Sequence, residues 1–150
     1  MENRQELGMK WYKFLIYFAL WAGAILNFIT AITYLTGSVY EAAGGSAELV
    51  YSAFPKLKGV DVFYGLILIV FSVFQIVVRY FLAGYKQKAP YMLLIMYVAV
   101  IVLELFYAIV GSIIIGESLF GEVIITIIAY GILTYVNYKY FENRIDLFIK

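Results

Sequence analysis

The amino-acid sequence predicts an all-α membrane protein, a four-transmembrane-helix bundle with both termini on the cytoplasmic side. Three observations support this prediction. Hydrophobic residues make up 65% of the 150 residues, whereas a soluble domain has about 45–50%. Charged residues make up only 14% and gather in short clusters between long uncharged runs, as in a chain that crosses a bilayer. Basic residues are divided unequally between the segments that join those runs, which predicts an orientation.

Four apolar runs are predicted to form the spans of a single membrane domain, residues 1–150, and they cover about residues 12–36, 62–83, 90–115 and 121–140. A helix needs roughly 20 mostly apolar residues to cross the hydrocarbon core. Barrel strands would alternate apolar and polar residues, and these runs do not, so helices are expected. The first run could be a cleaved signal peptide ending near Ala42 and Ala43. Its apolar stretch is longer than such peptides carry, which favours a retained span.

The orientation follows from the Lys and Arg residues. Nine of the eleven lie in the N-terminal segment, in or beside the connection between the second and third spans, or in the C-terminal tail. The other two, Lys56 and Lys58, lie in the loop between the first two spans. Connections rich in Lys and Arg stay in the cytoplasm, so both termini are expected there, in a plasma-membrane protein.

The loop over residues 37–61 is the one long connection. Residues 47–54 place apolar side chains on one face of a short helix that Pro55 would end. Such a segment is expected to lie on the outer membrane interface. A lid over a cavity is the alternative, but nothing polar is organised there beyond what amphipathicity explains. The link over residues 116–121 is short, so the last two spans should pack as an antiparallel hairpin.

Each span carries small or polar residues on one helical face. Small residues let two helix backbones approach closely, and the candidates for this role are Ala19, Gly23, Ala31 and Gly111. The polar residues need hydrogen bonds that lipid cannot supply, and they form a candidate intramembrane polar site: Asn27, Gln75, Arg79, Tyr97, Glu104, Tyr107 and Tyr130. Helix packing with interhelical hydrogen bonds is the simpler interpretation of these faces.

Glu104 is the only charged residue inside the third span and lies near its middle. An ionised carboxylate at the bilayer centre costs roughly 3 kcal/mol on insertion scales, so Glu104 should face the bundle interior and be paired or protonated. The hydrogen-bond donors expected near its depth are Asn27, Gln75, Tyr107 and Tyr130. An ion pair with Arg79 would require that side chain to turn inward, against its tendency to extend toward the interface. A neutral structural carboxyl and a functional site both stay open.

Composition excludes several kinds of chemistry. The chain has no Cys and no His, so disulfides, thiolate or imidazole metal sites and a Ser-His-Asp triad are not available. No cofactor and no metal are therefore expected. A net charge of +1 argues against the clustered basic surface that binds nucleic acid. The sequence also shows no inverted repeat of the kind that marks many transporters.

The first span contains the run Trp11-Tyr12-Lys13-Phe14-Leu15-Ile16-Tyr17-Phe18, followed by Leu20-Trp21, Asn27-Phe28, Gly37 and Tyr40. This pattern resembles the opening of a family of uncharacterised small four-span membrane proteins of Gram-positive gut bacteria. Some members carry a zinc ribbon, which this chain lacks, and the resemblance implies no activity. One Glu in a four-span chain is also similar to the small multidrug resistance exporters, but those place their acid in the first span, so the likeness is one of fold alone.

Two classes of function fit these observations. The first is a non-enzymatic accessory protein or complex subunit in the lipid bilayer, whose stripes pack helices within the chain, against a second copy, or against another membrane protein. The alternative is a small oligomeric transporter or channel that uses Glu104 as an intramembrane proton or cation site. An intramembrane enzyme is disfavoured, because the core has no His, no Cys and no paired acids. A hydrated cavity where the stripes meet would favour transport, and dry packing would favour a partner.

Overall fold

A computed structural model describes residues 8–150, and within this part of the chain every regular element is helical. Four helical segments are long and apolar enough to cross a bilayer: Lys10–Thr36, Pro55–Ala83, Ala89–Ile115 and Phe120–Glu142. Their 23 to 29 residues correspond to about 35–44 Å at 1.5 Å per residue, enough for a hydrocarbon core of about 30 Å. The predicted all-α four-helix fold is confirmed, and the chain is a multi-pass membrane protein.

The first span is built from three pieces, namely α1 (Lys10–Phe14), the π-helical segment η1 (Leu15–Ala19) and α2 (Leu20–Thr36). The other three spans are single helices, α5 (Pro55–Ala83), α6 (Ala89–Ile115) and α7 (Phe120–Glu142). The long connection contains two short helices, α3 (Ser38–Ala42) and α4 (Ala47–Ala53). A 3₁₀ turn, η2 (Ile145–Leu147), follows α7. Helix α4 is the short helix that the sequence predicts over residues 47–54.

Helix α5 starts before the apolar run that predicts the second span. Pro55 occupies its first turn, where a missing N–H group costs no hydrogen bond. Lys56 and Lys58 lie in the same opening turns. Hydropathy marks the part of a helix that lies in lipid rather than the point where the helix begins, so α5 extends beyond the run. Asp61 consequently lies on a long helix and not in the loop that precedes it.

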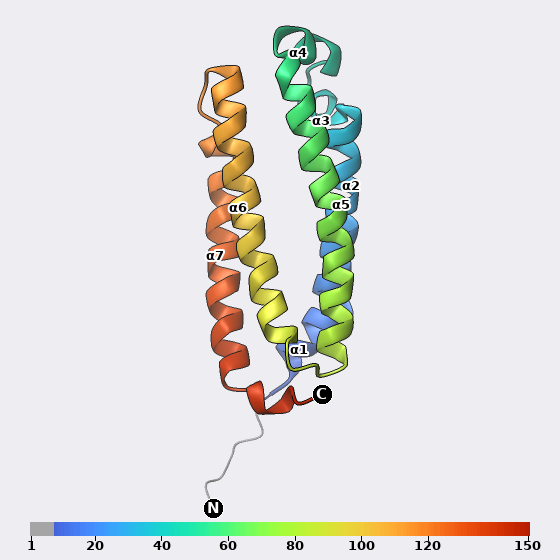
Figure 1. The fold of residues 1–150 in the computed structure, drawn as a ribbon, viewed down its shortest axis with the longest axis vertical. Helices are drawn as coiled ribbons and strands as arrows, with labels where there is room; N and C mark the ends of the chain where they lie inside the picture. Colours follow the sequence, from blue (N-terminus) through green and yellow to red (C-terminus); the bar gives the residue numbers. More distant parts are fainter. Residues whose placement is uncertain (1–7) are drawn as a thin grey trace, which may run out of the picture.

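Figure 1 shows two antiparallel pairs of helices, with α2 beside α5 and α6 beside α7. Contacts between α5 and α6 join the pairs. The pairs lie close together at one end, here called the base, which holds residues 8–14, 82–92 and 137–150. They diverge toward the far end, which holds α3, α4 and the link between α6 and α7. The bundle is therefore closed at the base and splayed at the far end.

The base contains most of the apolar core. Tyr12, Leu82 and Phe141, from three different spans, are each at most 3% exposed and belong to one buried cluster. The Tyr12 hydroxyl donates a hydrogen bond to the Leu82 carbonyl oxygen over 2.7 Å. Phe148, which follows η2, is 2% exposed, and its ring packs against those of Tyr12 and Phe141. The segment after α7 thus folds back and covers the base of the bundle.

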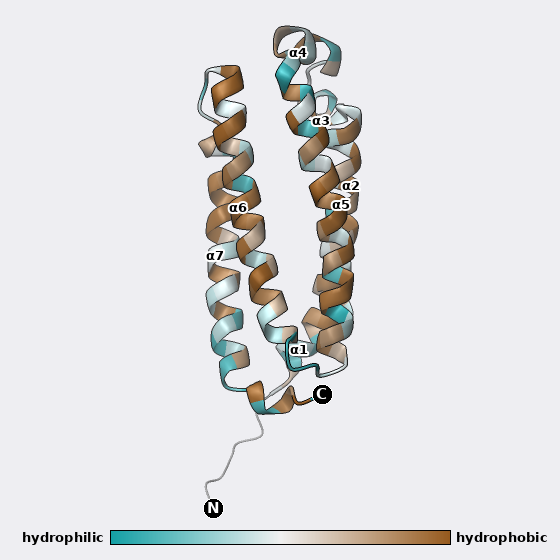
Figure 2. Cartoon of the chain, in the orientation of Figure 1, coloured by the Kyte–Doolittle hydropathy of each residue, from teal (hydrophilic) through white to brown (hydrophobic). Residues whose placement is uncertain are grey.

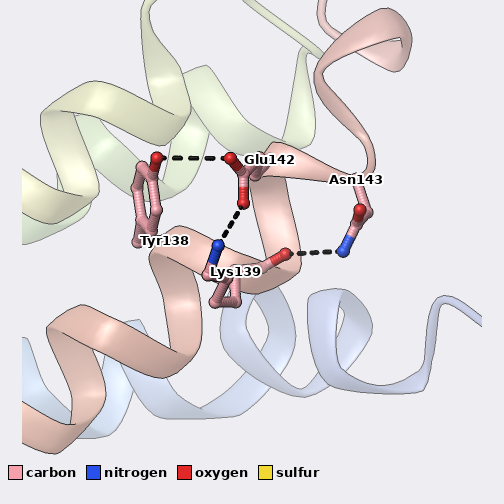
Figure 3. A network of polar contacts seen from close by, with 4 residues as sticks. All are labelled: Tyr138, Lys139, Glu142 and Asn143. Carbon is pink, nitrogen blue, oxygen red and sulfur yellow. Dashed lines mark hydrogen bonds and ion pairs between the residues drawn. The ribbon is translucent and has the colours of Figure 1, made fainter.

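Helix α7 ends in an exposed polar network (Figure 3). The Lys139 Nζ atom lies 2.9 Å from Glu142 Oε2, and the Tyr138 hydroxyl donates to Glu142 Oε1 over 3.3 Å. Asn143 Nδ2 donates to the Lys139 carbonyl oxygen over 3.0 Å. Solvent screens such pairs, so they contribute little to stability. Figure 2 shows this end of α7 as hydrophilic, while the middles of the four spans are mostly hydrophobic.

Candidate functional site: a reciprocal acid and tyrosine pair

Two carboxylates on neighbouring spans, those of Asp61 and Glu104, share one sequence pattern. On α5, Tyr64 follows Asp61 by three residues, and on α6, Tyr107 follows Glu104 by three residues. Residues three apart lie on the same side of a helix. Because α5 and α6 are antiparallel neighbours, the two acid–tyrosine steps run in opposite directions where the helices meet.

The tyrosines donate across the interface to the opposite acid. The Tyr107 hydroxyl donates to Asp61 Oδ1 over 2.9 Å, and the Tyr64 hydroxyl donates to Glu104 Oε1 over 2.9 Å. The two tyrosine rings lie 4.7 Å apart between centroids. The ring of Tyr34 on α2 packs against both, at 4.7 Å from Tyr64 and 5.4 Å from Tyr107. The result is a crossed pair of hydrogen bonds around three contacting phenol rings.

Asp61 is the more heavily bonded acid. It is 0% exposed, and its Oδ2 atom accepts from the hydroxyls of Tyr40 at 2.6 Å and Tyr51 at 3.0 Å. With Tyr107 on Oδ1, one carboxylate receives three phenol donors from α3, α4 and α6. Three donors offset much of the desolvation of a buried anion. Asp61 therefore ties both short helices to the spans.

Burial and the hydrogen bonds to Asp61 affect the pKa values of the phenols on the two short helices. Burial, followed by the hydrogen bond to Asp61, raises the pKa of Tyr51 to about 12. The same two causes raise the pKa of Tyr40 above its ordinary value. Both hydroxyls therefore stay protonated at neutral pH and remain donors to the carboxylate.

Glu104 is less completely bonded. Among residues 8–150, it has a single hydrogen bond, from Tyr64 to Oε1. Its second oxygen, Oε2, accepts none within that part of the chain, and the side chain is partly exposed. A carboxyl near the middle of a span with one oxygen unused is either protonated or bound by something outside these contacts.

Other predicted site residues form a second contact between the first two spans. Asn27 Nδ2 donates to Gln75 Oε1 over 2.7 Å. The helix-packing role predicted for small residues fits this region: a Cβ on Gly23 would lie 2.5 Å from Gln75 Nε2, and a Cβ on Gly65 would lie 3.0 Å from the Ala31 carbonyl oxygen. Thus Asn27 and Gln75 bond to each other and not to Glu104.

The remaining small residues have different neighbours. Gly111 lies under Leu119, whose Cδ1 atom would be 2.6 Å from an added Cβ, so it serves the link between α6 and α7. Ala19 lies in η1, beside a cavity described below. The rings of Tyr97 and Tyr130 lie 5.8 Å apart, and neither hydroxyl bonds to the crossed pair.

Arg79 bonds to the first span. Its Nε atom donates to the Ile16 carbonyl oxygen over 3.0 Å, and Ile16 lies in η1, where π-helical winding interrupts the regular α-helical ladder. The guanidinium lies 5.4 Å from the Trp21 ring centroid and 4.9 Å from that of Tyr80. Arg79 is therefore satisfied locally, and its partners do not include Glu104.

Four members of this site were not predicted from the sequence: Asp61, Tyr64, Tyr40 and Tyr51. An acid followed three residues later by Tyr in two successive spans is a signal that could have identified the first two. Residues at equal distances from the α5–α6 turn put Glu104 level with about Ser72, whereas its donor is Tyr64. Tyr64 lies eight residues from Ser72, about 12 Å along the helix. Counted from the observed ends of the two helices, Ala83 and Ala89, Glu104 is instead level with Leu68. The long Tyr side chain spans the remaining four residues, about 6 Å.

The carboxylates of this site can accept protons, and its phenols donate hydrogen bonds to them. Its chemistry is limited to acids, phenols and amides. Within residues 8–150, no three acidic side chains gather where a metal ion could bind. The chain matches no family model, no curated protein and no solved structure. Its own contacts and composition therefore carry the functional conclusion.

Proposed function

We propose that the chain is a non-enzymatic accessory subunit of a membrane complex, located in the plasma membrane with both termini in the cytoplasm. The observation that carries this proposal is the weak internal packing of α7. Only 11% of the apolar window of α7 is buried within the chain, against 28% in each of the other three spans. A helix that packs along one neighbour leaves most of its surface for lipid or for another protein.

Two glycines favour a protein over lipid on this helix. A Cβ added to Gly121 or Gly131 would meet nothing within 4 Å, so neither glycine makes room for another part of this chain. Glycine in a helix interior costs about 1 kcal/mol relative to alanine. Small residues are enriched where transmembrane helices approach each other closely, and a helix of a second protein would use the space that Gly131 leaves.

Several polar groups of the stripes pair within the chain, which supports a structural role. Asn27 bonds to Gln75, Ser72 Oγ donates to the Ala24 carbonyl oxygen over 2.8 Å, and Trp11 Nε1 donates to Asn137 Oδ1 over 3.0 Å. Such bonds hold helices together. The absence of His and Cys from the sequence further favours a non-enzymatic protein.

The distribution of charge supports the proposed orientation. The base holds Lys86, Lys88, Lys139, Arg144 and Lys150, whereas Lys56 and Lys58 begin α5 at the far end. Arg144 Nη2 donates to the Gly8 carbonyl oxygen over 3.0 Å, which keeps the two ends of the described chain together. A base rich in Lys and Arg belongs in the cytoplasm.

Site-specific photocrosslinking in membranes tests the subunit proposal. A photoreactive residue at Ile125 or Ile132, which are 76% and 59% exposed on α7, should give a discrete protein adduct that Gly131→Leu abolishes. Matched positions at Val70 and Val73, 62% and 58% exposed on α5, should give lipid adducts only. Equal adducts at all four positions, or none from α7, would contradict the proposal.

A second candidate, a small transporter or channel, rests on the unused Oε2 atom of Glu104. Glu104 lies near the middle of α6, the position at which intramembrane acids commonly bind protons or cations. Proton or sodium flux into liposomes that contain the purified chain tests this candidate. Flux that Glu104→Gln abolishes and Glu142→Gln leaves unchanged would support transport, and absence of flux would exclude it.

A further inference from the structure

A cavity of about 240 Å³ lies between the first span and the α6–α7 pair. All four spans contribute to its wall, and the residues that matter below are Trp11, Phe14, Gly23, Gln75, Tyr97 and Tyr130. Helix α7 contributes Tyr130 and Leu133 to the lining, and not Ile125 or Ile132, so the cavity does not depend on the two positions proposed for crosslinking to a partner. Gln75 is eight residues from the end of α5, which places its backbone about 12 Å along the helix from the base.

The amide group of Gln75 presents a donor to this cavity. Gln75 is 6% exposed, and its Oε1 atom is occupied by Asn27 Nδ2. That bond orients the amide so that Nε2 turns toward Gly23, where a Cβ would come within 2.5 Å of it. Within residues 8–150, no residue accepts a hydrogen bond from Nε2. In the same range, Arg144 Nε is the only unpaired polar side-chain atom that is fully enclosed. Gln75 Nε2 is therefore unpaired but still accessible.

Two phenols add further polar atoms to the same cavity. Tyr97 is 6% exposed, and its ring lies 5.8 Å from that of Tyr130. Within the described chain, neither hydroxyl makes a hydrogen bond to another residue. An unpaired donor that faces hydrocarbon is unfavourable, so three such groups around one cavity indicate an occupant that supplies acceptors.

The rest of the lining defines the class of that occupant. No Lys, Arg, Asp or Glu lines the cavity, so a charged ligand would find no counter-ion. The aromatic side chains of Trp11, Phe14, Tyr97 and Tyr130 offer flat apolar walls. Sites of this composition, apolar with a few convergent polar groups, bind neutral organic molecules.

We propose that this cavity binds a neutral, lipid-soluble molecule whose carbonyl oxygen accepts a hydrogen bond from Gln75 Nε2. The hydroxyls of Tyr97 and Tyr130 bond to the same or a neighbouring oxygen, and the apolar body of the molecule packs against Trp11 and Phe14. Two membrane sources supply such a carbonyl, the ring of a prenyl quinone and the ester of an acyl lipid. Fluorescence quenching by a quinone and mass spectrometry of retained lipids separate them.

Trp11 is a built-in reporter because it lines the cavity, whereas Trp21, the only other tryptophan, packs against Tyr80 outside it. In the full chain carrying Trp21→Phe, reconstituted in phosphatidylcholine nanodiscs, decylubiquinone should quench Trp11 fluorescence with saturation. Ala19→Phe, which fills the cavity, should weaken this binding by at least about tenfold. Ile25→Phe, a matched change at a 58% exposed position of the same span, should leave it unchanged.

The hydrogen bonds to the ligand are tested separately from the volume of the cavity. Tyr97→Phe and Tyr130→Phe remove one hydroxyl each and should weaken binding by about two- to tenfold, the range of one hydrogen bond. Gln75→Met should weaken it at least as much, and Tyr135→Phe on the outer side of α7 should have no effect. If Gln75→Met does not fold, the two phenylalanine variants still test the polar contacts.

The acyl-lipid source is tested by mass spectrometry of lipids retained by the detergent-purified chain. A lipid bound by the Ile25→Phe variant and lost from the Ala19→Phe variant would identify the ester as the natural carbonyl. Saturable quinone quenching without a retained lipid would identify the ring. Quenching that rises linearly with quinone and is the same in the Ala19→Phe variant, together with no retained lipid, would overturn the proposal.

Discussion

Asp61 and Glu104 belong to the same acid–tyrosine sequence pattern but have different hydrogen-bonding environments. Each is followed three residues later by a tyrosine, and each accepts from the tyrosine of the other helix. Asp61 has two further donors, Tyr40 and Tyr51, because it lies near the far end, where α3 and α4 fold back over α5. Glu104 lies in mid-span, where only neighbouring helices can offer a partner.

The difference teaches how an intramembrane acid acquires a role. A carboxylate with three phenol donors is fully satisfied, and Asp61 therefore acts as a structural tie. A carboxyl with one donor has a second oxygen free to accept a hydrogen bond, and Glu104 is therefore the group that can exchange a proton or bind a ligand. Four predictions test this contrast, starting with the largest expected effect.

Asp61→Leu should be the most damaging change, because it leaves three phenols without their acceptor. We expect a loss of roughly 3–5 kcal/mol of folding free energy, measured by unfolding in detergent micelles. Asp61→Asn keeps an oxygen acceptor and should lose less. An Asp61→Leu protein no less stable than Glu104→Leu would refute the claim that Asp61 is the structural acid.

Glu104→Leu should cost less, about 1–3 kcal/mol, because one phenol, that of Tyr64, loses its acceptor. Glu104→Gln retains an oxygen for that hydroxyl and should fold with nearly wild-type stability. Thermal unfolding of the two purified variants gives the comparison. If Glu104→Leu is monodisperse and as stable as wild type, the crossed hydrogen bond to Glu104 does not contribute to the fold.

Tyr64→Phe and Tyr107→Phe break the two halves of the crossed pair. Tyr64→Phe removes the single donor of Glu104, whereas Tyr107→Phe leaves Asp61 with two donors. We expect about 1–1.5 kcal/mol for the first and about 0.5–1 kcal/mol for the second. The same unfolding assay checks the order, and a larger effect of Tyr107→Phe would reverse the assignment of which acid is better satisfied.

The smallest effect concerns Tyr51 and pH. Its pKa is raised from 10.0 to about 12, so the folded state favours the protonated phenol. Its contribution is fully present below pH 10 and is lost as pH rises toward 12. Hydrogen exchange in α4 should therefore accelerate over this interval, and less so in Tyr51→Phe. An identical pH response in both proteins would show that Tyr51 is not responsible.

Some features of the chain could be predicted because lipid leaves few choices. Backbone groups in a bilayer must bond within their own segment, so a long apolar run becomes a helix. The short helix before Pro55 could be predicted from local spacing and a helix-ending proline. The need of Asn27, Gln75 and Glu104 for hydrogen-bond partners also followed from the sequence, because their polar groups have no favourable position in lipid.

Partners could not be predicted in the same way. Glu104 bonds to Tyr64 rather than to Asn27 or Gln75, and Arg79 bonds to a carbonyl that the π-helical segment η1 presents. Asp61 was assigned to a loop because the charged residues around it hid the continuation of α5. Each outcome depends on the rotation and axial shift of one helix against another, which side-chain identity alone does not specify.

By itself, the sequence determined the number of spans, their helical conformation and the need for polar partners, because hydropathy and backbone hydrogen bonding act locally on each segment. The tertiary structure decided that Asp61 and Glu104 each accept a hydrogen bond from the tyrosine on the opposite helix. It also decided that Asp61 has three donors and Glu104 one, and that Gln75 faces a cavity. Those results depend on distances of a few ångströms between helices, and short-range hydrogen bonds form only where packing brings donor and acceptor together.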